Sequence, residues 1–373
     1  MPTGAAIGYR PDMALKAVEK PLGSPWSRPL RGRFEQLTVE SELLFDNPLG
    51  DPARRPLYVY SSPGAAAPGA CGLTVVYVLQ GFTGQLDGWL ARKAFEPTFI
   101  ERLDRMFTAA GAAAEPAEAC PDAVIVFVDA WTSLGGSQFL NSPATGRYMD
   151  YLCEEVVPFI DARYPTAAER DRRAVTGHSS GGYGALVLPM LRPDVFGALV
   201  AHAPDTLFEY CYLRDFALTA RVLRDSYGGS YEALLEDAAG SADFDWGRWG
   251  AALNTYAMAA AYSPDLEHPG NVLLPFDPLT ARVIPELWER WLACDPVRMA
   301  PSCAGQLRSL RHIQLHAGRR DECLLDVGTL AFAAELEKLG VPHSVTLFDG
   351  GHGGNSGRYA PAIRDLLVDL NRR

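Results

Sequence analysis

The sequence predicts an α/β protein built on a mostly parallel, doubly wound sheet. Short apolar runs alternate along the chain with longer stretches of helical periodicity, and this alternation is typical of such sheets. The runs are apolar at consecutive positions, which indicates strands buried on both faces and therefore parallel pairing. Before them, two strand-like stretches at 34–44 and 56–60 flank a turn rich in asparagine, proline and glycine. These two stretches predict antiparallel strands at the N-terminal side of the sheet.

Six apolar runs are the expected core strands, at residues 73–79, 123–128, 174–176, 198–201, 312–316 and 344–348. Between them, apolar residues recur at helical spacing over 148–160 and over 327–339, and Gly340 and Pro342 end the second pattern. Ligands of doubly wound sheets bind at the carboxyl ends of the strands. We therefore expect the functional residues in the loops that follow these runs.

The chain divides into three parts by pattern. Residues 1–30 hold five prolines and no clear periodicity, and we interpret them as a surface arm. Residues 31–203 and 309–373 form the predicted α/β core. Residues 204–308 lack a core strand but are too long for a structureless loop, so they predict a mainly helical insertion over the active site. Its four tryptophans, Trp246, Trp249, Trp288 and Trp291, either form the core of the insertion or line a substrate pocket, and the first role is the commoner one.

Composition excludes several classes of protein. The formal charge is −11, from 34 basic and 45 acidic residues, and this acidity argues against nucleic acid and anionic membranes as partners. We find no apolar stretch of membrane-spanning length and no signal-peptide pattern at the N-terminus. Seven scattered cysteines without a CxxC spacing disfavour a disulfide framework or a zinc site. These features predict a cytoplasmic protein with reduced thiols, and they are compatible with a homodimer.

The strongest motif is Gly177-His178-Ser179-Ser180-Gly181, which matches GxSxG. A β-like run precedes it and a helix-like run with small residues follows, as expected of a tight strand-to-helix turn that exposes a nucleophilic serine. The turn needs small residues two positions before and after the serine. Ser180 is the rival nucleophile, but His178 would then occupy a position that requires a small residue. We therefore predict Ser179 as the nucleophile.

A serine hydroxyl needs a base, and the base needs an orienting carboxylate. His352 lies in a glycine-rich loop directly after the last predicted strand, so we predict it as the base; His178, His202, His312 and His316 are the weaker alternatives. Asp321 follows the strand at 312–316 and completes the order Ser, Asp, His. Glu322, Asp326 and Asp349 compete with Asp321 for the role of the acid.

Two backbone amides are expected to stabilise the negatively charged oxygen of the reaction intermediate. The amide of Ser180 begins the helix after the nucleophile, and the amide of Phe82 follows Gly81 in the loop after the first parallel strand. An ordinary glycine turn is the alternative interpretation of that loop.

Four residues after strand ends are candidates for contact with substrate, and these are Gly81, Trp131, His202 and Asp205. Asp205 is equally explained as a helix cap.

Three segments resemble the esterase D-like family of α/β-hydrolases. Residues 79–83 resemble its oxyanion loop, 177–186 its nucleophile turn, and 318–321 with 351–352 its acid and base loops. The family includes S-formylglutathione hydrolases, enterochelin and feruloyl esterases, and mycolyltransferases. The resemblance starts near residue 33 and is poorest in the insertion, which is longer than expected for S-formylglutathione hydrolases. It implies the α/β-hydrolase fold, the same three catalytic residues, and a mechanism without metal or cofactor.

The sequence thus predicts a serine esterase that hydrolyses a small-molecule carboxylic ester through an acyl-enzyme intermediate. An acyltransferase that uses the same three residues is one alternative. A non-catalytic binding protein on a hydrolase scaffold is another, and failure of Ser179 to react with a fluorophosphonate would favour it.

Overall fold

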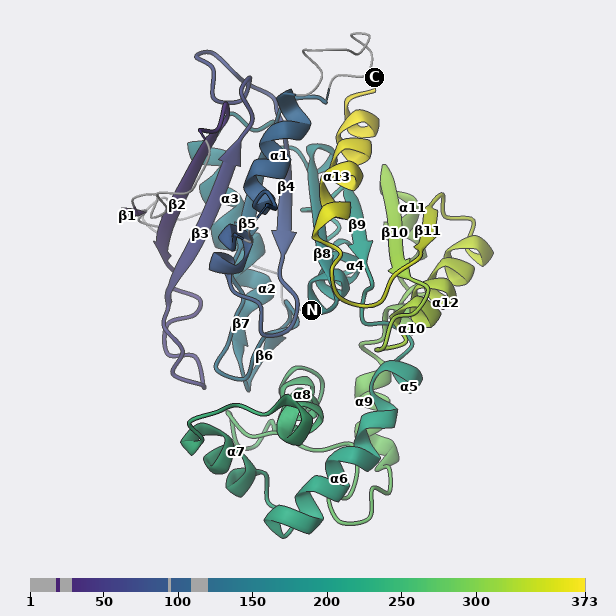
Figure 1. Cartoon of the computed structure of the whole chain (residues 1–373). Helices are drawn as coiled ribbons and strands as arrows, with labels where there is room; N and C mark the ends of the chain where they lie inside the picture. Colours follow the sequence, from purple (N-terminus) through teal and green to yellow (C-terminus); the bar gives the residue numbers. More distant parts are fainter. Residues whose placement is uncertain (1–17, 21–28, 93–94, 109–119, 373) are drawn as a thin grey trace, which may run out of the picture.

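The computed structural model describes residues 18–20, 29–92, 95–108 and 120–372, and a nine-stranded sheet runs through its centre (Figure 1). The strand order is β1-β2-β3-β5-β4-β8-β9-β10-β11. These strands are β1 (Val18–Lys20), β2 (Arg33–Glu40), β3 (Arg54–Ser61), β4 (Thr74–Leu79), β5 (Ala123–Val128), β8 (Arg173–His178), β9 (Ala198–His202), β10 (His312–Gly318) and β11 (Ser344–Phe348).

The pairing confirms the predicted mixture of strand directions. The strands from β5 through β11 pair in parallel, whereas β1, β2 and β3 pair antiparallel with their neighbours and with β5. All six predicted core strands are present. The strand predicted at 34–44 was too long, because β2 ends at Glu40. A turn follows, in which the hydroxyl of Ser41 accepts a hydrogen bond from the backbone amide of Leu44. β1 falls within the predicted arm, and the remainder of that arm up to residue 28 lies outside the described residues.

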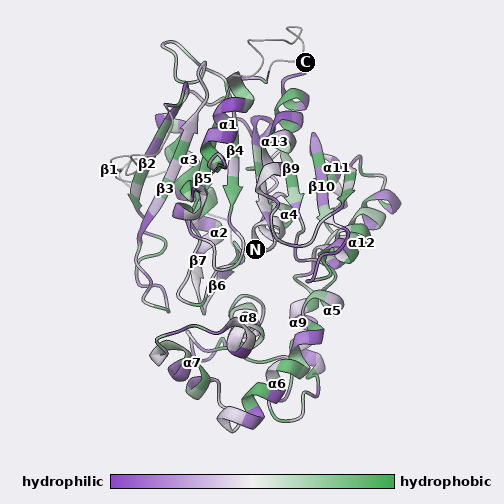
Figure 2. Ribbon diagram, in the orientation of Figure 1, coloured by the Kyte–Doolittle hydropathy of each residue, from purple (hydrophilic) through white to green (hydrophobic). Residues whose placement is uncertain are grey.

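Helices cover both faces of the sheet (Figure 1). One face packs against α1 (Phe99–Thr108) and α13 (Ser356–Asn371), with η1 (Leu86–Leu90) beside them. The other packs against α4 (Ser180–Leu191), α12 (Leu325–Lys338) and a continuous helical stretch made of α2 (Tyr148–Asp150), η4 (Tyr151–Val156) and α3 (Val157–Arg163). Figure 2 shows the apolar character concentrated on central strands such as β4. Burial on both faces explains why these strands are apolar at consecutive positions.

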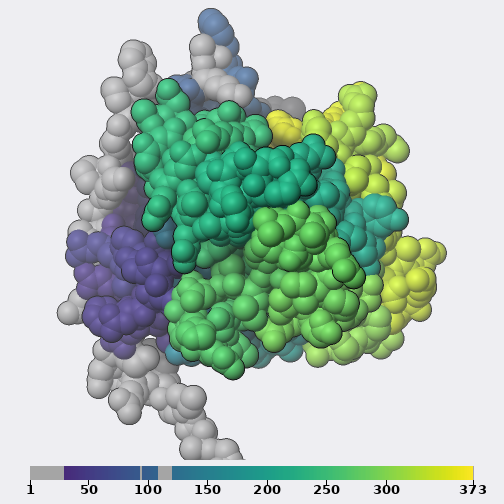
Figure 3. Space-filling view, turned by 90° about the horizontal axis from the view of Figure 1, so that it is seen from below, coloured from purple at the N-terminus to yellow at the C-terminus, as the bar shows by residue number. Residues whose placement is uncertain are grey.

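Seven helices connect β9 to β10, in agreement with the predicted helical insertion. They are α5 (Phe208–Cys211), α6 (Leu213–Tyr227), α7 (Tyr231–Gly240), α8 (Trp246–Tyr262), α9 (Pro285–Leu292), α10 (Pro296–Met299) and α11 (Ala304–Arg308). Figure 3 views the molecule from the side of the insertion, whose teal and green atoms cover much of that end. The side chains of Ser230 and Asp245 accept backbone amides at the starts of α7 and α8, and a left-handed Gly228 ends α6.

A few smaller features complete the described structure. A hairpin of β6 (Asn141–Ser142) and β7 (Gly146–Arg147) follows β5, and η5 (Arg170–Arg172) precedes β8. All seven cysteines are free thiols. In the described part of the chain, no helix has both the length and the hydropathy that a bilayer span requires.

Candidate active site

Ser179 lies at the tip of the turn between β8 and α4. Its backbone has φ 57° and ψ −124°, a strained conformation that non-glycine residues seldom adopt. A Cβ atom at position 177 would lie 2.2 Å from the carbonyl oxygen of Gly181, and one at position 181 would lie 2.5 Å from the carbonyl oxygen of Leu79. Both glycines are therefore required, because strand, turn and helix backbones approach too closely for a side chain.

A chain of hydrogen bonds connects Ser179 with His352 and Asp321. The Nε2 atom of His352 lies 3.2 Å from the Oγ atom of Ser179, and its Nδ1 atom lies 2.9 Å from the Oδ2 atom of Asp321. The three residues follow β8, β11 and β10 respectively, so parallel pairing brings these loops to one edge of the sheet. The side chain of Asp321 is fully buried, whereas that of His352 is 23% exposed. The buried Asp321 thus orients the imidazole ring through Nδ1, and Nε2 of the ring faces Ser179.

Three contacts fix the loop that carries His352. Its backbone amide donates to Oε2 of Glu322 over 2.7 Å. Its carbonyl oxygen accepts the side-chain amide of Asn355 over 2.7 Å and lies 2.9 Å from Nε2 of His178. Glu322, a competitor for the role of the acid, therefore holds the backbone of His352 instead of its ring. Asp349, another competitor, pairs with Arg320 at the surface over 2.8 Å.

The surroundings of His352 stabilise the protonated form of its imidazole ring. Burial lowers the pKa of His352, but the hydrogen bond and charge of Asp321 outweigh it, and the pKa is raised above its ordinary value. Burial by itself would raise the pKa of Asp321. The hydrogen bonds that its carboxylate accepts from His352 and from the amides of Cys323 and Leu325 outweigh this effect, so its pKa is lowered and the carboxyl group stays ionised. Such a pair matches the properties that a general base and its orienting acid require.

The predicted oxyanion donors are the amides of Ser180, directly after Ser179, and of Phe82, in the loop after β4. Ser180 is the first residue of α4, and Gly81 approaches so closely that a Cβ atom there would lie 3.1 Å from the carbonyl oxygen of His178. Among the described residues, the backbone amides of Phe82 and Ser180 donate no hydrogen bond. Gly81, Phe82, Ser180 and Trp131 line one pocket. Two unengaged amides beside a nucleophile are the donors that a developing oxyanion needs.

His202 and Asp205 do not line that pocket. The ring of His202 is buried and stacked between His316 and Tyr359, with centroid distances of 4.9 and 4.3 Å. Asp205 is also buried, and it accepts the hydroxyl of Ser180 over 3.0 Å. Leu207, and not Asp205, is the N-terminal cap of α5, and it makes no side-chain cap bond. Of the four predicted substrate contacts, Gly81 and Trp131 thus line the pocket, whereas His202 and Asp205 do not.

The four tryptophans of the insertion divide into two groups. Trp249, Trp288 and Trp291 are buried in the core of the insertion. Trp246 is 53% exposed at the start of α8, and its ring lies 6.4 Å from that of Phe82 in an edge-to-face arrangement. One tryptophan of the insertion therefore contacts the loop after β4.

Comparison with known proteins identifies the family. A sequence model of the family described as "Putative esterase" matches residues 55–359. The chain belongs to this esterase family. This confirms the predicted family and the prediction of a carboxylic ester hydrolase. A search of curated protein sequences finds no significant match.

Solved structures share the fold of this esterase at low sequence identity. A ferulic acid esterase is 18% identical with a TM-score of 0.55, over 92% of this chain and 99% of its own. An S-formylglutathione hydrolase from Agrobacterium tumefaciens is 16% identical with a TM-score of 0.52, over 96% and 99%. The serine hydrolase FphF from Staphylococcus aureus is 15% identical with a TM-score of 0.52, over 91% and 99%. These likenesses confirm the α/β-hydrolase fold.

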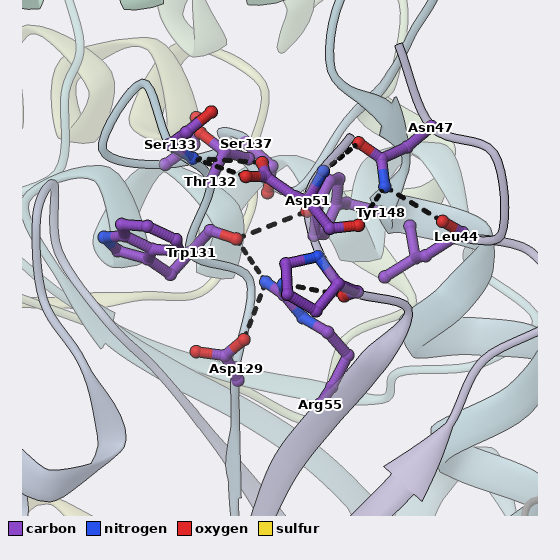
Figure 4. Close-up of polar contacts among 12 residues, drawn as sticks. Leu44, Asn47, Asp51, Arg55, Asp129, Trp131, Thr132, Ser133, Ser137 and Tyr148 are labelled. Atoms are coloured by element: carbon purple, nitrogen blue, oxygen red, sulfur yellow. Dashed lines mark hydrogen bonds and ion pairs between the residues drawn. The ribbon is translucent and has the colours of Figure 1, made fainter. Parts of the chain in front are cut away.

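The esterase fixes its Trp131 loop with residues that the sequence did not single out (Figure 4). Arg55 on β3 pairs with Asp129 over 2.7 Å, and the two side chains are 3% and 6% exposed. Arg55 also donates to the backbone carbonyl oxygens of Trp131 and Pro52. Next to it, Asp51 accepts the amide of Ser133. The sequence carries no clear signal for this site, because β3 begins with two adjacent arginines and only Arg55 is buried.

One group in the described part of the esterase could coordinate a metal ion. Asp321, Cys323 and His352 offer ligand atoms within 4.8 Å of one another. His352 and Asp321 already share a hydrogen bond, so a metal ion there would compete with that contact.

Proposed function

We propose that this esterase cleaves a small-molecule carboxylic ester through an acyl-enzyme intermediate, with Ser179 as nucleophile, His352 as general base and acid, and Asp321 as the orienting carboxylate. The observation that carries the proposal is the hydrogen-bonded chain of Ser179, His352 and Asp321 at the tip of a strained strand-to-helix turn. A strained, exposed serine next to an oriented imidazole is the arrangement that nucleophilic catalysis requires.

The first half-reaction forms the acyl-enzyme. His352 takes the proton of Ser179 through Nε2 while the serine oxygen attacks the ester carbonyl carbon. Asp321 keeps the other ring nitrogen protonated and stabilises the imidazolium that results. His352 then gives its proton to the leaving alcohol as the bond between carbonyl carbon and alkoxy oxygen breaks.

The second half-reaction returns the enzyme to its starting state. Water attacks the acyl carbon, His352 accepts a proton from that water, and the proton passes to Ser179 as the acid product leaves. In both halves the carbonyl oxygen becomes negatively charged. The amides of Phe82 and Ser180 are our proposed donors to it, and loss of one such donor raises the barrier by about 2.7–4 kcal/mol.

The pocket beside these donors suits a bound ester group. Gly81 keeps the loop backbone close to Ser179, and Trp131 adds an aromatic wall. Phe82 and Trp246 form a second aromatic contact at the same loop. Because Trp246 comes from residues 204–308, we propose that this helical segment acts as a cap that helps to bind the substrate.

Steady-state hydrolysis of short-chain p-nitrophenyl esters tests the proposal. We expect Ser179→Ala to reduce kcat by roughly 10⁴-fold or more, as loss of a triad serine does. Ser180→Ala is the matched control, because it removes a neighbouring hydroxyl but keeps the backbone amide, and it should lose no more than about 100-fold in kcat. Full activity of a folded Ser179→Ala variant would exclude Ser179 as the nucleophile. Transfer of the acyl group to an added alcohol in preference to water would assign an acyltransferase instead.

A further inference from the structure

A buried carboxylate contacts the residue that follows the nucleophile. The Oδ2 atom of Asp205 accepts hydrogen bonds from the hydroxyl of Ser180 over 3.0 Å, the hydroxyl of Tyr212 over 2.7 Å and the side-chain amide of Gln138 over 3.2 Å. The same Gln138 amide donates to the hydroxyl of Tyr262 over 2.9 Å. We call these five residues the Asp205 cluster. None of them is more than 5% exposed.

The members of the Asp205 cluster come from five places in the chain. Ser180 begins α4, and Asp205 lies in the loop after β9. Gln138 belongs to the loop after β5, where it adopts a left-handed φ of 53°. Tyr212 precedes α6 and Tyr262 ends α8, so both come from the helical insertion. The cluster therefore provides a direct polar path from the insertion to the oxyanion side of the active site.

Core packing alone gives no reason for a carboxylate at this position. Burial of an ionised group is costly, and apolar residues of similar volume usually serve a core equally well. Asp205 caps no helix, and three donors converge on one of its oxygens. What distinguishes the position is Ser180, whose backbone amide lies next to the nucleophile and is free to bind an oxyanion.

Burial raises the pKa of Asp205, and the hydrogen bonds that it accepts from Tyr212, Gln138 and Ser180 oppose that rise and favour its ionised form. The charge of the ionised carboxylate also acts on His352. The titratable groups that face His352 are Asp321, Glu322 and Cys323 after β10, Asp205 after β9, and His178 on β8. The three carboxylates raise the pKa of His352, the contribution of Asp321 being the largest. A carboxylate near an oxyanion would oppose that charge, so the benefit of Asp205 must come from orientation of Ser180 and from support of the imidazolium.

We propose that Asp205 is a positioning residue, which holds Ser180 and its amide in register with the nucleophile, supports the charged form of His352, and makes the helical insertion part of the catalytic apparatus. This inference rests on the proposed serine-esterase function. Tyr212, Gln138 and Tyr262 hold the carboxylate, and Asp205 in turn holds Ser180.

The decisive variant is Asp205→Asn, which keeps the shape of the side chain and removes its charge. We expect kcat for p-nitrophenyl acetate to fall roughly 10- to 100-fold while KM changes by less than about threefold, because the loss concerns the transition state. Without the charge of Asp205 the pKa of His352 falls, so the acidic limb of kcat/KM against pH should move to lower pH. Tyr212→Phe removes one donor and keeps the charge, so it should lower kcat less and leave the acidic limb in place.

Asp295→Asn is the matched control for a purely structural effect. Asp295 is another fully buried carboxylate of the insertion, and it accepts the amides of Leu207, Phe208 and Val297 without contact to Ser180. Its loss should lower the melting temperature and leave kcat and the acidic limb of the folded enzyme unchanged. If Asp205→Asn behaves in the same way, Asp205 is a structural residue and the proposal is wrong.

Two further outcomes are decisive. If Asp205→Asn fails to fold, Tyr212→Phe carries the test, and an unchanged kcat in that variant would overturn the proposal. If the wild-type enzyme itself neither hydrolyses esters nor reacts with a fluorophosphonate at Ser179, the proposed function fails. Normal wild-type turnover with an unaffected Asp205→Asn variant refutes only the inference about Asp205.

Discussion

The ring nitrogen Nε2 of His178 lies 2.9 Å from the backbone carbonyl oxygen of His352, and the two rings are 4.4 Å apart. A carbonyl oxygen only accepts hydrogen bonds, so Nε2 of His178 carries the proton. Burial and the proximity of His352 lower the pKa of His178 to about 4, which keeps this ring neutral. His178, the residue before Ser179, thus holds the loop that carries His352.

Loss of this contact should weaken catalysis without loss of the fold. We expect His178→Leu to reduce kcat/KM by roughly tenfold, because one hydrogen bond that orients His352 is removed. His178→Gln keeps a side-chain donor and should recover part of the loss. Steady-state kinetics of the two variants with one p-nitrophenyl ester provide the comparison. Equal activity of His178→Leu and the wild type would contradict an orienting role.

The nucleophile turn should tolerate no side chain at position 177. A Cβ atom there would lie 2.2 Å from the backbone of Gly181, so we expect Gly177→Ala to destabilise the protein by more than about 2 kcal/mol and to abolish activity. Gly305 in α11 is the matched control, since a Cβ atom there meets nothing within 4 Å. Gly305→Ala should raise stability by up to about 1 kcal/mol, as expected for an exposed helix. Thermal unfolding midpoints distinguish the two, and equal midpoints would refute this account of the turn.

Two adjacent arginines allow a direct comparison of a buried and an exposed ion pair. Arg55 and Asp129 are 3% and 6% exposed, whereas Arg54 and Glu40 are 64% and 56% exposed. We expect Arg55→Met to cost about 3–5 kcal/mol of stability, because it leaves Asp129 buried and unpaired. Arg54→Met should cost at most about 1 kcal/mol. Denaturant titrations measure both values, and a smaller loss for Arg55→Met than for Arg54→Met would show that the pair does not hold the Trp131 loop.

Buried histidines should make the fold sensitive to mild acid. Burial lowers the pKa of His316 from 6.5 to about 4, and the pKa of His202, which stacks on it, also lies well below 6.5. Between pH 6.5 and about 4 the histidines of the unfolded chain bind protons that those of the folded chain do not, so the free energy of unfolding falls as the pH falls. The slope is about 1.4 kcal/mol per pH unit for each such group. His316→Phe keeps the stacked ring and should flatten the dependence of the unfolding free energy on pH. An unchanged slope in His316→Phe would contradict this assignment.

The sequence predicted the central strands β4, β5 and β9 well because both of their faces are buried, which makes them apolar at consecutive positions. It did not predict α13, which begins beside a glycine-rich loop and carries Pro361 in its interior. Proline normally argues against a helix, yet here the buried stripe of α13 packs against the sheet and outweighs it. Tertiary packing of this kind leaves little local trace in the sequence.

Within the site, the predictable residues are those that local turns position. Ser179, Asp321 and His352 each follow a strand end, so chain order and loop chemistry suffice to predict that they meet. The environment of Asp205 depends on Gln138, 67 residues away, and on side chains of the insertion. The position of the His202 side chain depends on the pairing register of β9 and β10, because that register places His202 directly opposite His316. Neither relationship could be predicted from one segment alone.

The most direct test of the central claim is the site of covalent modification by a fluorophosphonate. Peptide mapping by mass spectrometry after complete inhibition should find one adduct, on Ser179, and the Ser179→Ala variant should gain none. An adduct on Ser180, or an active enzyme that turns over esters while Ser179 stays unmodified, would contradict the proposed acyl-enzyme mechanism.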